Sequence, residues 1–335
     1  MNELNIVNVK DVFVPGINTG DDPGARMQAA IDLCESQNKV LYIPNGVYTP
    51  SKKLICRKPI GIISDPLALI RWTNRESCGI RFDFRGVPSA FADIRLPALF
   101  SPAIDSTFCI PGYRFNDAQY DVYSRIGVGV ELIDADRTNI SIQYSCGWYS
   151  GLMLVSREKA LANINVNIHT MDFCYKGLNF FGEQTTSAVV ATINTIWAKY
   201  PIYLDATDQL ITGNTINIPG QTFVNERGGC VIYGRTADPA RLTSNTFNIN
   251  WISAGRNGDS PPNTPDDLKC PYLGGNGEDP AQLYDDGVQT FDGRYNSFYL
   301  GSSRAPVNVP AMQISEDDMR IRNSGIGNKI IRNFV

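Results

Sequence analysis

Aromatic and charged side chains recur in this sequence just ahead of a small residue that opens a short apolar run. The small residue is Gly129, Gly151, Gly177 or Gly229. The preceding positions hold Trp148, Tyr149, Tyr175, Lys176, Lys199, Tyr200, Glu226 and Arg227, with Asp172 and Trp197 slightly upstream. Regularly spaced rings can pack on the apolar faces of sugars, which predicts a polysaccharide-binding surface. The alternative is packing inside the fold, because tyrosine and tryptophan are often buried.

The side chains expected to bind substrate are Trp148, Tyr149, Tyr175, Lys176, Trp197, Tyr200 and Arg227. A second set follows the apolar runs and comprises Asp134, Asp136, Glu158, Glu183, Asp205 and Asp208, with Arg157 and Arg235. Neighbouring carboxylates can shift one another's pKa values towards acid/base chemistry, so Asp136, Glu158 and Asp208 are second candidates for catalysis. We favour the alternative, a solvated turn face, where Asp and Glu are common.

No metal and no cofactor are predicted. The single histidine, His169, cannot form a histidine-rich metal site, and no catalytic Ser–His or Cys–His arrangement is recognisable around it. The eight cysteines are scattered singly, which indicates buried reduced thiols. Acidic residues between 253 and 293 lack the ordered spacing of a calcium loop.

The elements that must position these side chains repeat between residues 127 and 252. Each repeat has an apolar run of period two, a polar turn and a second run that begins at Asn139, Asn163, Asn214 or Asn245. The spacing runs from 22 residues (Gly129 to Gly151) to 31 residues (Asn214 to Asn245). This repetition predicts a β-solenoid, with a β-sandwich as the alternative. In a solenoid, equivalent residues form columns about 4.8 Å apart, and asparagines at turns can hydrogen-bond from coil to coil.

The organisation predicted along the chain has five parts. They are 1–66, an N-terminal helix and first coil; 67–126, early coils with side loops; 127–252, regular coils; 253–294, a long loop insertion; and 295–335, C-terminal coils. Asp22 and Pro23 predict a helix start, and Met27, Ala30, Ile31 and Cys34 form its apolar stripe. We expect this helix to cover the open edge of the first coil, and a partner subunit or a lid to cover the last strands.

Charge and composition exclude several classes of partner. The net charge of −4 argues against nucleic-acid binding, and no run approaches the ~18 apolar residues of a membrane span. The first residues lack the basic and apolar stretches of a secretory signal. We therefore expect synthesis in a reducing cytoplasm without classical export.

One segment carries a family resemblance. Between residues 8 and 66 a strand, a Gly-Asp-Asp, a helix and a Leu-Tyr-Ile-Pro-x-Gly-x-Tyr stretch follow one another, with Asp21, Asp22, Ala29, Ala30, Ile31, Tyr42, Pro44, Gly46 and Tyr48 as the matching residues. This order resembles the N-terminal cap of the pectate-lyase-like β-helix superfamily. The resemblance implies an all-β, right-handed, single-stranded parallel β-helix with a capping α-helix. The superfamily includes polygalacturonases, pectate lyases, sugar epimerases and bacteriophage tailspikes, so its activity is open.

In the polygalacturonase branch, acid/base carboxylates lie just before the strand that starts with Gly. The resemblance therefore assigns catalysis to Asp172 and Glu226, about 10 Å apart by stacking alone, which suits an inverting pair. The chain lacks the Asn-Thr-Asp, Gly-His-Gly and Arg-Ile-Lys motifs of that branch, which argues against a polygalacturonase in the strict sense.

These observations favour a bacteriophage virion protein of the tailspike type. It would be made in the host cytoplasm and would bind a bacterial surface polysaccharide, with or without cleaving it as a glycoside hydrolase or lyase. The resembled tailspikes are trimers, so a homotrimer and contacts with other virion proteins are expected. The alternatives are a non-catalytic structural or receptor-binding β-helix protein of the virion, and a free polygalacturonase- or pectate-lyase-like enzyme.

Overall fold

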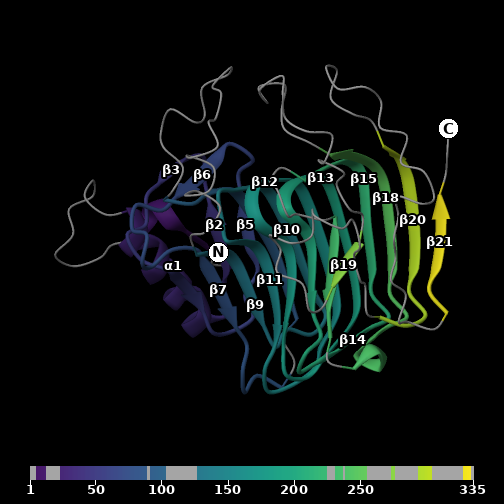
Figure 1. The fold of residues 1–335 in the computed structure, drawn as a ribbon. Coiled ribbons are helices and arrows are strands. Elements are labelled where there is room, and N and C mark those ends of the chain that lie inside the picture. The colour runs from purple at the N-terminus through teal and green to yellow at the C-terminus, as the bar shows by residue number, and fades with distance from the viewer. Residues whose placement is uncertain are drawn as a thin grey trace, which may run out of the picture.

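The computed structural model describes residues 5–12, 23–88, 91–102, 127–224, 231–236, 238–254, 273–275, 293–303 and 327–332. Most of these residues form β-strands, and every strand pair among them is parallel. The strands stack from the first coils, in purple, to β21, in yellow (Figure 1). This is the pairing pattern of a parallel β-helix. The β-sandwich alternative is wrong, because it requires antiparallel sheets.

The described elements are an α-helix, two short 3-10 helices and strands numbered in chain order. They are β1 (Ile6–Asn8), η1 (Val9–Asp11), α1 (Pro23–Gln37), β2 (Val40–Ile43), β3 (Gly46–Tyr48), β4 (Leu54–Cys56), β5 (Ile62–Ser64), β6 (Ala68–Arg71), β7 (Ile80–Asp83), β8 (Ala92–Phe100), β9 (Val128–Ile133), β10 (Thr138–Cys146), β11 (Ser150–Ser156), β12 (Leu161–Gly182), β13 (Thr185–Asp205), β14 (Leu210–Thr212), β15 (Thr215–Val224), β16 (Ile232–Arg235), η3 (Pro239–Arg241), β17 (Leu242–Thr243), β18 (Thr246–Ala254), β19 (Leu273–Gly275), β20 (Ser297–Ser303) and β21 (Lys329–Arg332).

Successive coils place their strands in three stacks. The first stack runs from β1, β2 and β5 through the start of β8 to β21. The second stack begins with β3 and β6 and continues through the end of β8. The third stack begins with β4, β7, β9 and β11. β12 and β13, of 22 and 21 residues, each pass through all three stacks and so form almost a whole coil.

Alternate residues on each strand point into the coils and form one long core. The column through the first stack contains Ile94, Ile140, Val166, Ala191, Ile216, Phe247 and Phe298, all at most 3% exposed. The last two rings stack face to face, with their centroids 5.1 Å apart. A shift of one residue in the register of a strand would place its buried side chains on the outer face. The cost would be about 1.5–3 kcal/mol for each large side chain exposed.

The predicted glycine column is confirmed for three of its members. The register of β9, β11 and β12 places Gly129, Gly151 and Gly177 opposite one another, whereas Gly229 lies outside the described residues. A Cβ atom on Gly177 would lie 2.5 Å from the carbonyl oxygen of Pro201 in the next coil. The small residue therefore recurs because neighbouring coils touch at this point.

The predicted hydrogen bonding between asparagines is also confirmed. Asn214, Asn245, Asn296 and Asn328 form a ladder in which each Nδ2 donates to the next Oδ1, at 2.9, 3.0 and 3.3 Å in turn. The same oxygens accept backbone N–H groups from the preceding coil. The first three of these side chains are at most 1% exposed, so the ladder satisfies polar groups inside the fold.

The other two predicted asparagines bond outside this ladder. Asn139 is exposed, and its Oδ1 accepts a hydrogen bond from Nδ2 of Asn165 at 2.9 Å. Asn163 adopts a φ of 56° and donates to Asp136 at 3.2 Å. Asparagine tolerates this left-handed backbone better than most residues.

α1 packs on the first coil, and its predicted stripe of Met27, Ala30, Ile31 and Cys34 belongs to the main core. The amide of Gln28 takes the place of a neighbouring strand for β4. Its Oε1 accepts from the Ile55 N–H at 2.8 Å, and its Nε2 donates to the Ile55 carbonyl at 2.9 Å. The Glu35 carboxylate accepts the N–H groups of Arg57 and Lys58. These bonds satisfy part of an otherwise open strand edge.

The coils extend beyond the region predicted to be regular. β6 to β8 pair in register before residue 127, and β20 and β21 continue the first stack. β19 lies inside the stretch predicted as one long insertion and pairs with β16, so part of that stretch belongs to the third stack. In the described ranges, no helix combines the length and the apolarity needed to cross a membrane.

Candidate functional site

The second stack meets the third at a corner where most of the predicted binding residues lie. We call it the aromatic corner and define it by residues 144–149, 170–176 and 195–200. The residues 147–149 join β10 to β11, whereas β12 and β13 pass around the corner without a break. Three further connections between these stacks, 103–126, 225–230 and 255–272, lie outside the described residues. Glu226 and Arg227 are therefore not placed.

Asp172 lies at this corner, beside an irregularity in its strand. The pairing of β12 with β13 shifts register between Met171 and Cys174, which marks a β-bulge. Phe173, directly after Asp172, has a φ of 50°, a conformation that costs a non-glycine residue about 1–3 kcal/mol. Bulges and strained backbone are enriched at functional sites, where they redirect a side chain.

The Asp172 carboxyl group is largely enclosed. Its Oδ2 accepts a hydrogen bond of 2.8 Å from the hydroxyl of Tyr144 in the preceding coil. Its Oδ1 is buried and has no hydrogen-bond partner among the described residues. Burial raises the pKa of this carboxyl to about 6, although the Tyr144 hydrogen bond and the Phe173 backbone act in the opposite direction. A group with this pKa can give or take a proton near neutral pH. Because Oδ1 is buried, the atoms that cover it would have to move before a substrate could reach it.

The tyrosines of the corner pack on one another. Tyr149 and Tyr175 stack with centroids 5.2 Å apart and planes 16° apart. Tyr203 stacks on Tyr233 in the same way, at 4.8 Å and 15°. Tyr200 meets Tyr175 edge-on at 5.5 Å and so joins the two stacked pairs. We call these five side chains the tyrosine cluster.

The exposure of these rings decides which of them a sugar can touch. Tyr149 is 38% exposed, whereas Tyr200 is only 1% exposed. Trp148 is completely buried in the main core and packs edge-on against Trp72, so its predicted role in substrate binding is wrong. Tyr175 is half-buried. Within the predicted set, Tyr149 therefore offers the most open ring surface.

Lys176 holds its ammonium group among these rings. Its Nζ lies 3.5 Å from the centroid of Tyr203 and 5.4 Å from that of Tyr149. Burial lowers the pKa of this lysine to about 8, while the nearby Asp205 carboxylate acts in the opposite direction. Contact between a desolvated cation and tyrosine faces contributes about 2 kcal/mol, so Lys176 helps to hold the tyrosine cluster together.

Trp197 belongs to a separate apolar cluster on the second-stack side of the corner. Its ring lies 4.7 Å from that of Phe173, and the cluster also contains Phe100, Tyr144 and Cys146. The residues predicted from the sequence to form the site do not include Tyr144, Phe173, Tyr203 or Tyr233. Tyr203 and Tyr233 occupy equivalent positions in Pro-Ile-Tyr-Leu and Val-Ile-Tyr-Gly, and aligning those two runs would have placed them in one column.

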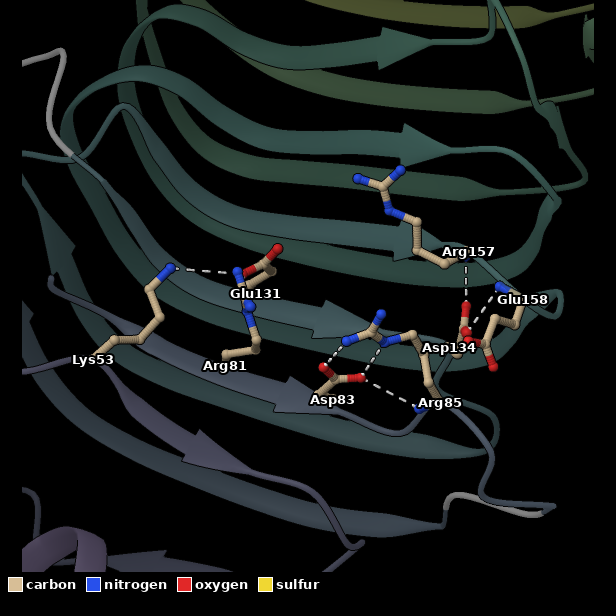
Figure 2. Close-up of polar contacts among 8 residues, drawn as sticks. All are labelled: Lys53, Arg81, Asp83, Arg85, Glu131, Asp134, Arg157 and Glu158. Carbon is tan, nitrogen blue, oxygen red and sulfur yellow. Dashed lines mark hydrogen bonds and ion pairs between the residues drawn. The ribbon is translucent and has the colours of Figure 1, made fainter. Parts of the chain in front are cut away.

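The second set of acidic residues lies at the far end of the third stack. Asp134 follows β9 and is fully buried, and it accepts the backbone N–H groups of Arg157 at 2.6 Å and Glu158 at 3.0 Å (Figure 2). Asp136 bonds to Arg137 and Asp208 is exposed. β11, of seven residues, separates the ends of the third stack by roughly 20 Å. Asp136, Glu158 and Asp208 are thus turn residues remote from Asp172.

The outer side of the third stack carries charged residues in the early coils and tyrosines in the later coils. In the early coils it is charged, and Glu131 accepts from Arg81 at 2.6 Å with Lys53 at 3.8 Å (Figure 2). The register places Arg81 and Glu131 in the column that later holds Tyr203 and Tyr233. Among the described residues, no group of three His, Cys, Asp or Glu side chains could hold a metal ion.

Comparisons with known proteins do not assign the chain to a family. No protein-family model matches the chain, and no curated protein matches it. Two solved structures are similar. One is DFA-IIIase from Arthrobacter chlorophenolicus A6 without its lid, with a TM-score of 0.42, 13% identity, and coverage of 99% of this chain and 90% of that one. The other is the Agl-KA catalytic domain, with a TM-score of 0.34, 15% identity and coverage of 99% and 69%. Similarities at this level do not extend to activity.

Proposed function

We propose that this protein binds a polysaccharide at the aromatic corner and that Asp172 is the acid/base group if a glycosidic bond is broken there. The observation that carries the proposal is the position of Asp172, an enclosed carboxyl with a pKa raised to about 6, three residues before the tyrosine cluster. A carboxyl with a strongly perturbed pKa is a candidate acid/base group, and aromatic rings can pack on the apolar faces of sugars.

The chemistry follows from these two parts. The exposed part of the Tyr149 ring would pack on the apolar face of a sugar and orient the chain across the corner. In both hydrolysis and elimination the departing sugar oxygen takes up a proton, which a protonated carboxyl with a pKa near 6 can supply. The pKa of Asp172 predicts that activity depends on pH near that value.

A non-catalytic binding protein is the second candidate function. Glycoside hydrolysis normally uses two carboxylates. In the described part of the chain, the other candidate carboxylates lie at the far end of the third stack, and Glu226 has no described position. A solenoid that only binds its glycan would retain the tyrosine cluster and would make no use of the proton on Asp172.

The biological setting that we propose is a bacteriophage virion of the tailspike type, with the protein made in the host cytoplasm and assembled as a homotrimer. The support is the resemblance of residues 8–66 to the cap of that superfamily. We infer a right-handed winding, because connections between parallel strands are almost always right-handed. The hydrogen bonds from Gln28 and Glu35 to the first coil support a capping role for α1. The other alternative, a free polygalacturonase- or pectate-lyase-like enzyme, has weaker support because the polygalacturonase motifs are missing.

The test is binding and cleavage of defined glycans by the purified protein. Bacterial capsule, lipopolysaccharide and pectin should be compared by microarray binding, product sizing and absorbance of unsaturated ends. Tyr149→Ala should reduce binding about 5- to 150-fold, since loss of a stacking ring costs about 1–3 kcal/mol. Tyr295→Ala, which removes a 60% exposed tyrosine outside the corner, is the matched control.

Each outcome separates the candidates. Asp172→Asn should abolish cleavage and retain binding if the protein is an enzyme, whereas wild-type binding without products identifies the non-catalytic alternative. Absence of binding to every glycan, or equal binding by both tyrosine variants, would overturn the proposed site. Native mass spectrometry measures the oligomeric state, and proteomic analysis of purified virions tests the setting.

A further inference from the structure

Among the described residues, Tyr144 makes the only side-chain hydrogen bond to the Asp172 carboxyl. Its hydroxyl donates to Oδ2 at 2.8 Å across two neighbouring coils. The tyrosine is held by its surroundings, because its ring packs on Phe100 at 5.4 Å and belongs to the apolar cluster with Cys146 and Phe173. The register pairs Tyr144 with Thr170, two residues before Asp172, so the hydroxyl reaches diagonally along the outer side of the corner.

The two oxygens of Asp172 consequently have different environments. Oδ2 already faces a donated hydrogen, so a proton on that oxygen would compete with the Tyr144 bond. Oδ1 is buried and has no partner among the described residues. A carboxyl group that accepts on one oxygen carries its own proton on the other.

The remaining titratable groups around Asp172 do not compete with Tyr144 as charged partners. They are the thiols of Cys146 from β10 and Cys174 from β12. Burial raises the pKa of Cys174 to about 12, so this thiol stays neutral at physiological pH. No Lys, Arg or His acts on the Asp172 carboxyl among the described residues, and the hydrogen bond from Tyr144 is therefore the main side-chain influence on it.

We propose that Tyr144 is a positioning residue for Asp172, holding Oδ2 so that Oδ1 is the oxygen that gains and loses the proton. The consequence for catalysis rests on the proposed function, whereas the positioning does not. On deprotonation the proton leaves Oδ1 and the hydrogen bond from Tyr144 becomes charge-assisted, which stabilises the carboxylate.

The experiment is an NMR titration of the full chain labelled with ¹³C at aspartate carboxyl carbons. The Asp172 signal is the one that disappears in Asp172→Asn. Tyr144→Phe keeps the packed ring and removes the donor, so the pKa of Asp172 should rise by about one to two units. Tyr149→Phe removes a hydroxyl from the same corner that makes no bond to Asp172, and it should leave the titration unchanged.

A second substitution protects the test against misfolding. Site-specific 3-fluorotyrosine at position 144 keeps the shape of the residue and makes its hydroxyl a stronger donor, so the Asp172 pKa should fall. An unchanged Asp172 titration in both variants would overturn the proposal.

The titration needs no substrate, so its result is independent of the proposed function. If a glycan is cleaved, the pH–rate profile of Tyr144→Phe should shift upward with the pKa of Asp172. If the wild type cleaves nothing, the catalytic role fails while the NMR titration still decides whether Tyr144 controls the carboxyl.

Discussion

Asp172 shows at the scale of one residue how a candidate catalytic group weakens the fold that holds it. The carboxyl lies beside an apolar cluster, and burial favours its protonated form. The unfolded chain has an ordinary aspartate pKa of 3.8, and folding raises it to about 6. The unfolded state therefore releases its proton first as pH rises, and the native state loses stability over that interval.

We predict that Asp172→Asn stabilises the protein at alkaline pH. The cost of the carboxylate is absent below pH 3.8, develops between pH 3.8 and about 6, and is complete above that pH. A shift of two units corresponds to about 3 kcal/mol, which is the upper limit of the gain at pH 8. Urea unfolding at pH 5 and pH 8 measures the difference. The exposed Asp208→Asn should change stability by less than about 0.5 kcal/mol at either pH, and an equal effect of Asp172→Asn at both would contradict the prediction.

For the neighbours Trp148 and Tyr149, the sequence predicted the position in the fold but not whether each side chain is buried or exposed. Residue type and spacing placed both at the aromatic corner, and both lie there. Their directions differ, since Trp148 is buried in the core and Tyr149 is exposed. In a turn of three residues the alternation of a strand does not apply, so the side that each ring faces depends on tertiary packing. Tyr144 was missed because its role depends on the register between coils.

At the scale of an element, the asparagine ladder gives a sharp stability test. Asn245→Ala removes side-chain bonds to Asn214, Asn296 and the Ile211 carbonyl, all in a buried environment. We expect a loss of about 2–4 kcal/mol in the free energy of unfolding, because several buried groups are left unsatisfied. Denaturant titration measures this loss.

The control for the ladder is an asparagine pair near the surface. Asn248 donates to Asn217 at 2.7 Å in a partly buried position, so Asn248→Ala should cost no more than about 1 kcal/mol. A similar cost for both alanine variants would show that burial does not distinguish the ladder.

The glycine column leads to a second prediction at this scale. Gly177→Ala would bring Cβ to 2.5 Å from the Pro201 carbonyl oxygen and 2.4 Å from Cδ1 of Ile196. We expect a loss of at least about 2 kcal/mol, since the strands must move apart. Gly213→Ala has open space around it but a φ of 65°, so it should cost about 1–2 kcal/mol. Thermal unfolding of the two variants measures the difference, and equal midpoints would contradict close contact between the coils.

The elements themselves were largely predictable, for a physical reason. Period-two alternation and recurring glycine and asparagine are direct consequences of coils stacked in register, so they are visible in the sequence. β12 and β13 were less predictable as single long strands, because the polar turns inside them look like breaks. β19 was hidden within a stretch rich in Gly, Pro and Asp whose composition predicts a loop.

At the scale of the whole molecule, the coils behave as a one-dimensional array in which each coil contacts its neighbours. The ends are then the places where backbone groups lack a partner coil. At the first coil α1 replaces that partner through Gln28 and Glu35. The resemblance of residues 8–66 predicted a helix at this position, but the sequence did not reveal that its polar residues bond to the edge of β4.

We predict that Gln28→Ala combined with Glu35→Ala opens the edge of the first coil without unfolding the coils further along. The Ile55 N–H and carbonyl would lose their partners, as would the N–H groups of Arg57 and Lys58. Hydrogen exchange should therefore increase in β4 and stay slow in β12 and β13, because the effect passes only between adjacent coils. The freed edge should also promote association that increases with concentration, measurable by sedimentation. Gln37→Ala, at the exposed end of α1, is the control. Equal loss of protection in β4 and β13 would mean that the solenoid unfolds as one cooperative unit and that α1 has no special role at its end.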